Sequence, residues 1–132
     1  MITYRERCPV DDVALSQLHA AAFGENARLV AWGARLARHS LSWFGAFDGE
    51  RLVGFVNLAW DGDRHAFLLD TVVAPPHRGR GIGRELVARA RRAAADAGCT
   101  WLHVDFAEAL TPFYRDACGM PPTAAGLVRL HR

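Results

Sequence analysis

Apolar and polar side chains change their spacing several times along the first third of the chain. Residues 2–7 alternate weakly, which predicts a strand. The Asp11-Asp12 pair then provides an N-terminal cap for a helix that ends at Phe23, before Gly24-Glu25-Asn26. Apolar residues spaced for one helical face predict a second helix from Ala27 to about His39.

The middle of the chain has the shorter period of extended strands. Strands are predicted over Trp43 to Phe47, Leu52 to Trp60 and Ala66 to Val73. The segments between them contain Asp48-Gly49 and Asp61-Gly62, and Asp-Gly pairs favour tight hairpin turns. The pattern therefore predicts an antiparallel meander.

Helical spacing returns after Pro75-Pro76, which end the third of these strands. A helix is predicted from Gly81-Ile82-Gly83 to a stop at Gly98. Its expected buried face is Ile82, Leu86, Ala90, Ala93 and Ala97.

The last third predicts a strand over Trp101 to Phe106, a short helix over Ala109 to Ala117 and a final strand over Gly126 to His131. The first of these strands is expected to run parallel to the strand that ends at Val73, because the helical connection is long enough for a crossover. The order of elements predicts one α+β domain over residues 1–132, with a mixed sheet and flanking helices.

Composition narrows the possible functions. The 132 residues are 51% hydrophobic, and the net charge is only +2, so nucleic acid is not an expected partner. All 16 basic residues are arginines, and the absence of lysine excludes both Schiff-base chemistry and the Walker-type phosphate loop. The three cysteines form no C-x-x-C pair, and the histidines have no metal-ligand spacing, so no disulfide framework and no metal are expected. No apolar stretch is long enough to span a membrane and no signal-peptide pattern opens the chain, so the expected location is the cytoplasm.

The segment from Val72 to Arg84 joins a predicted strand to a predicted helix and contains three glycines and three arginines. Free backbone N–H groups and the positive end of the helix dipole favour an anion at such a place, and a pyrophosphate fits. The G-x-G-x-x-G spacing of dinucleotide-binding loops is not met, because its last position falls on Arg84 or Leu86. A nucleotide-dependent oxidoreductase is therefore the weakest alternative.

Two motifs resemble those of one family. Arg78-x-x-Gly81-x-Gly83, preceded by Val72-Val73-x-Pro75, is similar to the acyl-CoA signature of the GNAT acyltransferases. Phe113-Tyr114, followed by Gly119-Met120, is similar to the second landmark of that family. The resemblance implies a sheet that is splayed between the strands ending at Val73 and Phe106, with acetyl-coenzyme A in the split.

This resemblance also implies roles for individual residues. The expected coenzyme A site comprises Val72, Val73, Arg78, Gly79, Arg80, Gly81, Ile82, Gly83, Arg84 and Phe113. Backbone N–H groups near Val72 and Val73 would polarise the thioester carbonyl. The phenol of Tyr114, with an ordinary pKa of about 10, would protonate the leaving thiolate.

The base that accepts the proton of the amine is harder to assign. Members of the family often place a carboxylate or histidine at positions that here are Phe67 and Leu69, and neither accepts a proton. Strict alternation puts Asp70 on the opposite face, which favours a structural role. His103 and Asp105 share a strand face and are the remaining candidates for a relay; a local hydrogen bond between them is the alternative.

The expected activity is transfer of an acetyl group from acetyl-coenzyme A to a primary amine. The missing base motivates a second hypothesis, a non-catalytic module that senses acyl-CoA. The tryptophans are interpreted as core residues. The acceptor is not encoded in any motif of the sequence, and a homodimer is possible because exposed sheet edges are commonly covered by a partner.

Overall fold

A five-stranded mixed sheet forms the centre of the computed structural model, which describes residues 1–131. The strands are β1 (Ile2–Glu6), β2 (Ser40–Asp48), β3 (Arg51–Trp60), β4 (His65–Val73) and β5 (Trp101–His103). They lie in the order of the chain, and all neighbours are antiparallel except β4 and β5, which are parallel. The predicted fold class, the meander and the parallel pair are confirmed.

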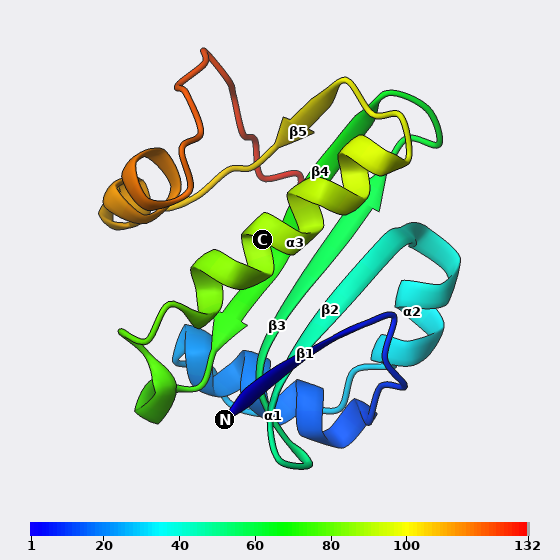
Figure 1. Ribbon diagram of the computed structural model, residues 1–132, viewed down its shortest axis with the longest axis vertical. Helices are drawn as coiled ribbons and strands as arrows, with labels where there is room; N and C mark the ends of the chain where they lie inside the picture. Colours follow the sequence, from blue (N-terminus) through cyan, green and yellow to red (C-terminus); the bar gives the residue numbers. More distant parts are fainter. Residues whose placement is uncertain (132) are drawn as a thin grey trace.

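Helices cover both faces of this sheet (Figure 1). On one face, α3 (Ile82–Asp96) packs against apolar side chains of β2, β3 and β4. On the other, α1 (Asp12–Phe23) and α2 (Trp32–His39) enclose a second apolar cluster around Phe55 and Val72. Within residues 1–131, no helix is both long and apolar enough to cross a membrane.

Local chemistry accounts for the ends of α1. The carboxylate of Asp11 accepts hydrogen bonds from the backbone N–H groups of Val13 and Ala14, at 3.0 and 3.1 Å. Gly24 ends the helix with a φ of 67°, a left-handed conformation that glycine adopts without a steric cost. Both ends lie where the sequence predicts them.

Helix α2 is shorter than predicted, because residues 27–31 do not join it. Side chains of α1 hold this connection in an irregular path. The hydroxyl of Ser16 accepts from the N–H of Val30 at 3.0 Å, and Asp12 accepts from the N–H of Gly33 at 2.9 Å. These contacts satisfy backbone donors that a longer helix would have used internally.

The buried face of α3 also differs from the prediction. Ile82, Leu86 and Ala90 are buried as expected, together with Val87 and Ala94. Ala93 is half-buried, and Ala97 is exposed because it follows the last residue of the helix.

The C-terminal third is less regular than predicted. Strand β5 ends at His103, and the expected helix consists of a 3₁₀ turn (Glu108–Leu110) and a π-helical turn (Pro112–Ala117). The predicted final strand over residues 126–131 is wrong, since no residue of this segment joins the sheet. Leu127, Val128 and Leu130 are exposed there. The sheet ends on this side at β5, which is three residues long.

Only some of the tryptophans are core residues as predicted. Trp32 and Trp43 are buried, which agrees with their interpretation as core residues. Trp60 is half-buried, whereas Trp101 is 60% exposed on the short edge strand, so a core role for Trp101 is wrong.

Candidate functional site

The sheet is split between β4 and β5. The two strands pair only where His65–Phe67 face Trp101–His103, so residues 68–73 of β4 have no partner on that side. The free edge is about 20 Å long, at 3.3 Å per residue. Its backbone donors and acceptors are available to a ligand that enters the split.

A β-bulge lies within this free edge. Asn57 of β3 pairs with Leu69 and Phe55 pairs with Val72, so both Asp70 and Thr71 stand opposite Val56 alone. Asp70 has a φ of 59°, in the left-handed region that aspartate tolerates better than most side chains.

The bulge corrects the expectation for Asp70. Strict alternation would turn this side chain away from the face of Leu69, but the extra residue reverses the alternation. Asp70 instead faces α1 and α2, where it contacts His19 and Arg35.

The loop after β4 has the form expected for an anion site. A 3₁₀ turn (Pro75–His77) leads into the loop, and Gly79 and Gly81 have φ values of 77° and 81°. Nothing lies within 4 Å of the position that a Cβ would take at either glycine, so the main chain is open to a ligand. Gly81 is the N-cap of α3 and has no side chain, so the first N–H groups of the helix remain without a side-chain cap.

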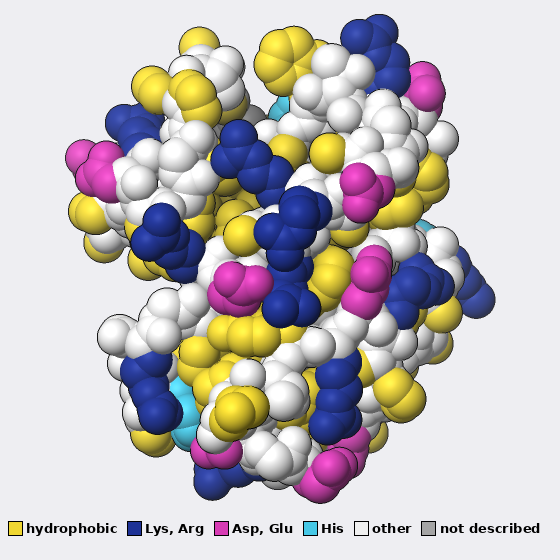
Figure 2. All heavy atoms as spheres, in the orientation of Figure 1, with side chains coloured by type: hydrophobic (Ala, Val, Ile, Leu, Met, Phe, Trp, Pro, Cys, Tyr) yellow, Lys and Arg dark blue, Asp and Glu magenta, His cyan; other side chains and the backbone are white. Residues whose placement is uncertain are grey.

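Basic and apolar side chains surround this loop. Figure 2 shows arginines gathered along α3 and a hollow between the C-terminal segment and the loop, with apolar side chains on its floor. Arg84 and Arg91 lie near Cys118, and Arg91 donates to the Cys118 carbonyl at 3.2 Å. Arg78, on the opposite side of the loop, donates to the Ala22 carbonyl at the end of α1, also at 3.2 Å.

Gly83 and Phe113 are in contact. A Cβ on Gly83 would stand 3.2 Å from the ring of Phe113, so a larger residue would force the ring to shift by a few tenths of an ångström. The Phe113 ring lies edge-on to Tyr114, with centroids 4.8 Å apart. The two predicted motifs, far apart in the chain, thus meet beside the split.

Tyr114 is buried at this junction, with 6% of its surface exposed. Its ring stacks on Phe106 at 4.7 Å. Burial raises the pKa of the phenol above its ordinary value, the side chain of Thr71 acts in the opposite direction through a hydrogen bond, and the charge of Asp105 raises it further. The phenol is therefore protonated at neutral pH and lies close to the bulge.

His103 and Asp105 do not form the relay suggested by their spacing. Nε2 of His103 lies 2.7 Å from Nδ1 of His65, and its ring stacks on Phe67 at 4.7 Å. The strand has already ended at His103, so Asp105 no longer shares a regular strand face with it. Asp105 makes no side-chain hydrogen bond to another described residue, although its charge acts on Tyr114.

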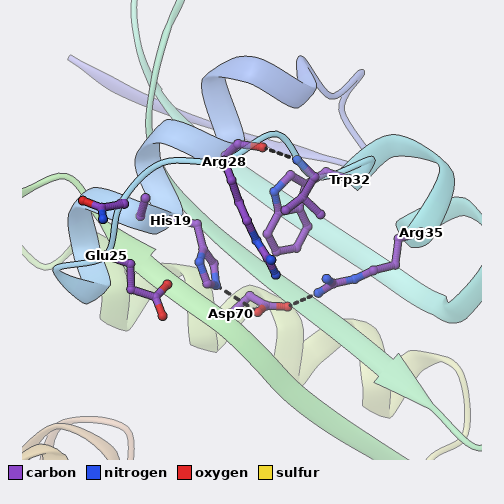
Figure 3. A pocket seen from close by; sticks show the side chains of 10 residues that line it. His19, Glu25, Arg28, Trp32, Arg35 and Asp70 are labelled. Atoms are coloured by element: carbon purple, nitrogen blue, oxygen red, sulfur yellow. Dashed lines mark hydrogen bonds and ion pairs between the residues drawn. The ribbon is translucent and has the colours of Figure 1, made fainter. Parts of the chain in front are cut away.

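A pocket lies on the other face of the sheet, against α1 and α2. It has a volume of about 280 Å³ and is bounded by α1, the connection to α2, the first turns of α2 and the bulge. Figure 3 shows His19, Arg28, Arg35 and Asp70 directed toward one another inside it.

Asp70 is the most connected side chain of this pocket. It accepts hydrogen bonds from Nε2 of His19 at 3.1 Å, from Arg35 at 3.1 Å and from Nδ2 of Asn57 at 3.2 Å. The residue type of Asp70 was a signal in the sequence. Aspartate is depleted in strand interiors, so its presence there indicates an interruption of the strand such as a bulge. His19 gave no signal, since it lies in an ordinary helical pattern.

No set of three or more His, Cys, Asp or Glu side chains within residues 1–131 is arranged to hold a metal ion. The split with its free strand edge, the uncapped loop and the buried phenol together correspond to one class of protein, the acyltransferases.

Comparison with known proteins gives the family. The chain matches the model of the acetyltransferase (GNAT) family over residues 10–120, and it belongs to that family. A mycothiol acetyltransferase from Nocardia farcinica is 41% identical over 69 residues, which are 52% of this chain and 22% of that protein. The chain thus spans about a fifth of the length of this curated relative.

Solved structures share the fold over the whole chain. An acetyltransferase of the GNAT family from Streptococcus pneumoniae has a TM-score of 0.77 and 26% identity, with coverage of 100% of this chain and 99% of the other. The protein AAC(6')-Iy, solved with the bisubstrate analog CoA-S-monomethyl-acetylneamine, has a TM-score of 0.76 and 19% identity, with coverage of 100% and 99%. At 19% identity, the similarity to AAC(6')-Iy concerns the fold alone.

Proposed function

We propose that the protein transfers an acetyl group from acetyl-coenzyme A to a primary amine, by direct attack of the amine on the thioester in a ternary complex. One observation carries the proposal. The bulge at Asp70 and Thr71 lies in the free edge of β4. Tyr114 and the loop after β4 are on one side of it, and the pocket of His19 is on the other. A donor in the split and an acceptor in the pocket would therefore meet at the bulge.

The donor half uses the residues expected from the sequence. The pyrophosphate of coenzyme A would bind the N–H groups of the loop from Arg78 to Arg84, where the helix dipole adds a favourable field. The acyl arm would lie along the free edge of β4, and the main chain at Val72 and Val73 would supply donors to the thioester carbonyl. Phe113, which fits against Gly83, would form an apolar wall of this channel.

Tyr114 is proposed as the acid that protonates the leaving thiolate. Its raised pKa keeps the phenol protonated through the neutral range. Proton donation from a phenol to a thiolate is uphill in water, but burial in the same site raises the pKa of the departing thiol as well. The pKa values of the phenol and of the departing thiol therefore shift in the same direction. This limits the free-energy cost of the proton transfer.

His19 and Asp70 are proposed as the route by which the amine loses its proton. The carboxylate of Asp70 accepts a hydrogen bond, so Nε2 of His19 carries the proton and Nδ1 is left as the acceptor in the neutral ring. An alkyl ammonium with a pKa of about 10.4 is neutral only about once in a few thousand at pH 7, which adds about 4 to 5 kcal/mol to the barrier without help. A histidine held by a carboxylate reduces this cost.

This pair removes the main reason for considering a non-catalytic sensor, which was the lack of a base on β4. Asp105 is retained as a second candidate because its charge reaches the phenol of Tyr114. The names of the relatives agree with an acetyl donor, and in AAC(6')-Iy the bound analog contains coenzyme A.

A thermal-shift titration with coenzyme A, acetyl-coenzyme A and NAD at equal concentrations tests the donor site. A ligand at one hundred times its dissociation constant stabilises the fold by about 2.7 kcal/mol, which is a shift of several degrees. We expect the two coenzyme A ligands, and not NAD, to raise the melting temperature. A shift with NAD alone, or with none of the three, would overturn the assignment of the loop.

Turnover is tested by the release of free coenzyme A thiol from acetyl-coenzyme A in the presence of amines. An enzyme releases thiol in an amine-dependent reaction that Tyr114→Phe slows while coenzyme A affinity is kept. A sensor binds acetyl-coenzyme A and releases no thiol with any amine, so this outcome would reject catalysis.

A further inference from the structure

The pocket of His19 and Asp70 also contains groups that the transfer of an acetyl group does not require. Its walls carry two acidic side chains, Glu25 and Asp70, and two basic ones, Arg28 and Arg35. These four side chains indicate which kind of acceptor the pocket binds. This inference rests on the proposed function, in which the pocket holds the amine.

The two arginines differ in what they contact. Arg35 donates to Asp70 at 3.1 Å, and its guanidinium lies 4.2 Å from the centre of the Trp32 ring. Arg28 makes no ion pair and no side-chain hydrogen bond with the described residues. Figure 3 nevertheless shows its side chain extending into the pocket, with its guanidinium group near the imidazole ring of His19 and the guanidinium group of Arg35. Arg28 therefore has no fixed anionic partner among the described residues and can pair with an anionic group of a ligand.

Trp32 provides a second, independent observation. Its side chain lines the pocket and only 2% of the residue is exposed, yet the indole N–H has no hydrogen-bond partner among residues 1–131. Buried donors in folded proteins are nearly always paired, because an unpaired one has lost its water without compensation. A ligand oxygen that displaced the groups now covering Nε1 of Trp32 would satisfy this donor.

The acidic groups of the pocket would bind the positively charged part of the ligand. Asp70 with His19 marks the position of the reacting amine, and the carboxylate of Glu25 lies on the same side of the pocket as His19 (Figure 3). A polycationic acceptor would favour walls that are mostly acidic, whereas here two acids are balanced by two arginines. The lining instead matches a molecule that carries one positive and one negative group close together.

We infer that the acceptor is a free amino acid, with its α-amino group beside Asp70 and His19 and its carboxylate bound by Arg28 and the indole N–H of Trp32. The volume of about 280 Å³ is at the small end of ligand sites and agrees with a molecule of this size. Guanidinium groups bind carboxylates with strong, charge-assisted hydrogen bonds. The chain therefore has a specificity residue, Arg28, that is separate from the groups that move protons.

The test compares each amino acid with the amine that lacks only its carboxylate. Suitable pairs are leucine with 3-methylbutylamine, phenylalanine with 2-phenylethylamine, and lysine with cadaverine, within a panel of the twenty common amino acids. Acetylation is followed by thiol release, and binding to the protein saturated with coenzyme A is measured by calorimetry. We expect at least one amino acid to exceed its decarboxylated partner by about 10- to 100-fold in kcat/KM, the range of one charge-assisted contact.

Arg28→Gln should raise the KM of the preferred amino acid about 10- to 100-fold and leave that of the decarboxylated amine within about twofold. Arg38→Gln is the matched control, because Arg38 is an exposed arginine of α2 that does not line the pocket. Trp32→Phe keeps an aromatic ring and removes only the N–H and the second ring, so it should weaken the same amino acid and spare the amine.

The outcomes separate this inference from the proposed function. Equal rates for amino acids and decarboxylated amines, unaffected by Arg28→Gln, would overturn the inference while acetyl transfer to amines stands. Binding of an amino acid that depends on Arg28, without any thiol release, would support the site and reject the transferase. No binding of any amino acid, by calorimetry or by turnover, would overturn the inference.

Discussion

Replacing Asp70 with asparagine tests the central feature of the site. Asparagine has nearly the same shape and tolerates the left-handed conformation that Asp70 adopts at φ 59°, so the bulge should persist. The carboxylate, however, accepts hydrogen bonds from His19, Arg35 and Asn57. An amide has one oxygen, so at least one of these donors would face an NH₂ group.

The loss of stability can be estimated from these contacts. Each lost hydrogen bond costs about 1 kcal/mol, and the Asp70 side chain is only 17% exposed, so water replaces it poorly. The pair with Arg35 adds less than about 1 kcal/mol, because the Arg35 side chain is 45% exposed and solvent screens it. The expected total is about 2 kcal/mol, or roughly 6 to 10 °C in melting temperature for a domain of this length.

The expected effect on catalysis is larger. The amide of the Asp70→Asn variant would no longer fix the proton on Nε2 of His19 or stabilise the charged ring, so kcat at pH 7 should fall by about 100- to 10,000-fold. Affinity for coenzyme A should stay within about twofold, because Asp70 faces the side of the sheet away from α3. Thiol release measures kcat, and calorimetry measures the affinity.

Asp63→Asn is the control, since Asp63 is an exposed turn residue that lies outside the pocket. If Asp70→Asn lowered the melting temperature but kept kcat within about threefold of the wild type, Asp70 would be structural and the proton route through His19 would be wrong. If neither quantity changed, the hydrogen-bond cluster itself would be refuted.

Three further results are expected. Tyr114→Phe should lower kcat by about 100-fold or more and leave the calorimetric dissociation constant of coenzyme A within about twofold; a loss of affinity with unchanged kcat would contradict its role as the acid. Gly83→Val should weaken coenzyme A binding at least tenfold and cost about 1 to 3 kcal/mol in urea unfolding, because a Cβ stands 3.2 Å from Phe113; wild-type affinity in this variant would show that the contact yields. The pKa of Tyr114 is raised by burial above 10.0, so its contribution to stability is complete below about pH 10 and is lost as the pH rises through the folded pKa. The urea midpoint should therefore fall more steeply above pH 10 in the wild type than in Tyr114→Phe, and parallel pH profiles would argue against a buried phenol.

The conformation of the loop after β4 was predictable because its signals are local. The glycines of the loop adopt positive φ values or make a close contact within a few residues of each other, and such requirements are written in residue type and spacing. The Asp-Gly turns and the capped ends of α1 belong to the same category. Phe113 and Tyr114 were singled out through a second motif of the family, and the structure places Phe113 against Gly83.

The pocket of His19 and Asp70 depends on contacts between distant segments. The side of the sheet that Asp70 faces is decided by a register shift against β3, and alternation along β4 alone gives the wrong side. The pocket exists because Ser16 and Asp12 hold residues 27–33 out of a longer helix. Neither effect has a signature within a short window of sequence.

Two other errors have related causes. His103 was paired with Asp105 by spacing, but the parallel alignment of β5 with β4 places it against His65. The final segment has apolar residues at suitable intervals for a strand, but periodicity within a segment does not show whether a sheet edge lies beside it in the fold.

The bulge has a consequence for how the two substrates influence each other. Asp70 and Thr71 are consecutive residues, so one planar peptide unit joins the side chain that lines the pocket of His19 to the side chain that contacts Tyr114. Under the proposed function, a ligand that displaced Asp70 would also move Thr71 relative to the phenol. Acceptor and donor would then be linked thermodynamically, and each would change the affinity of the other by the same factor. The coupling between the two substrates would run through a single peptide bond of β4.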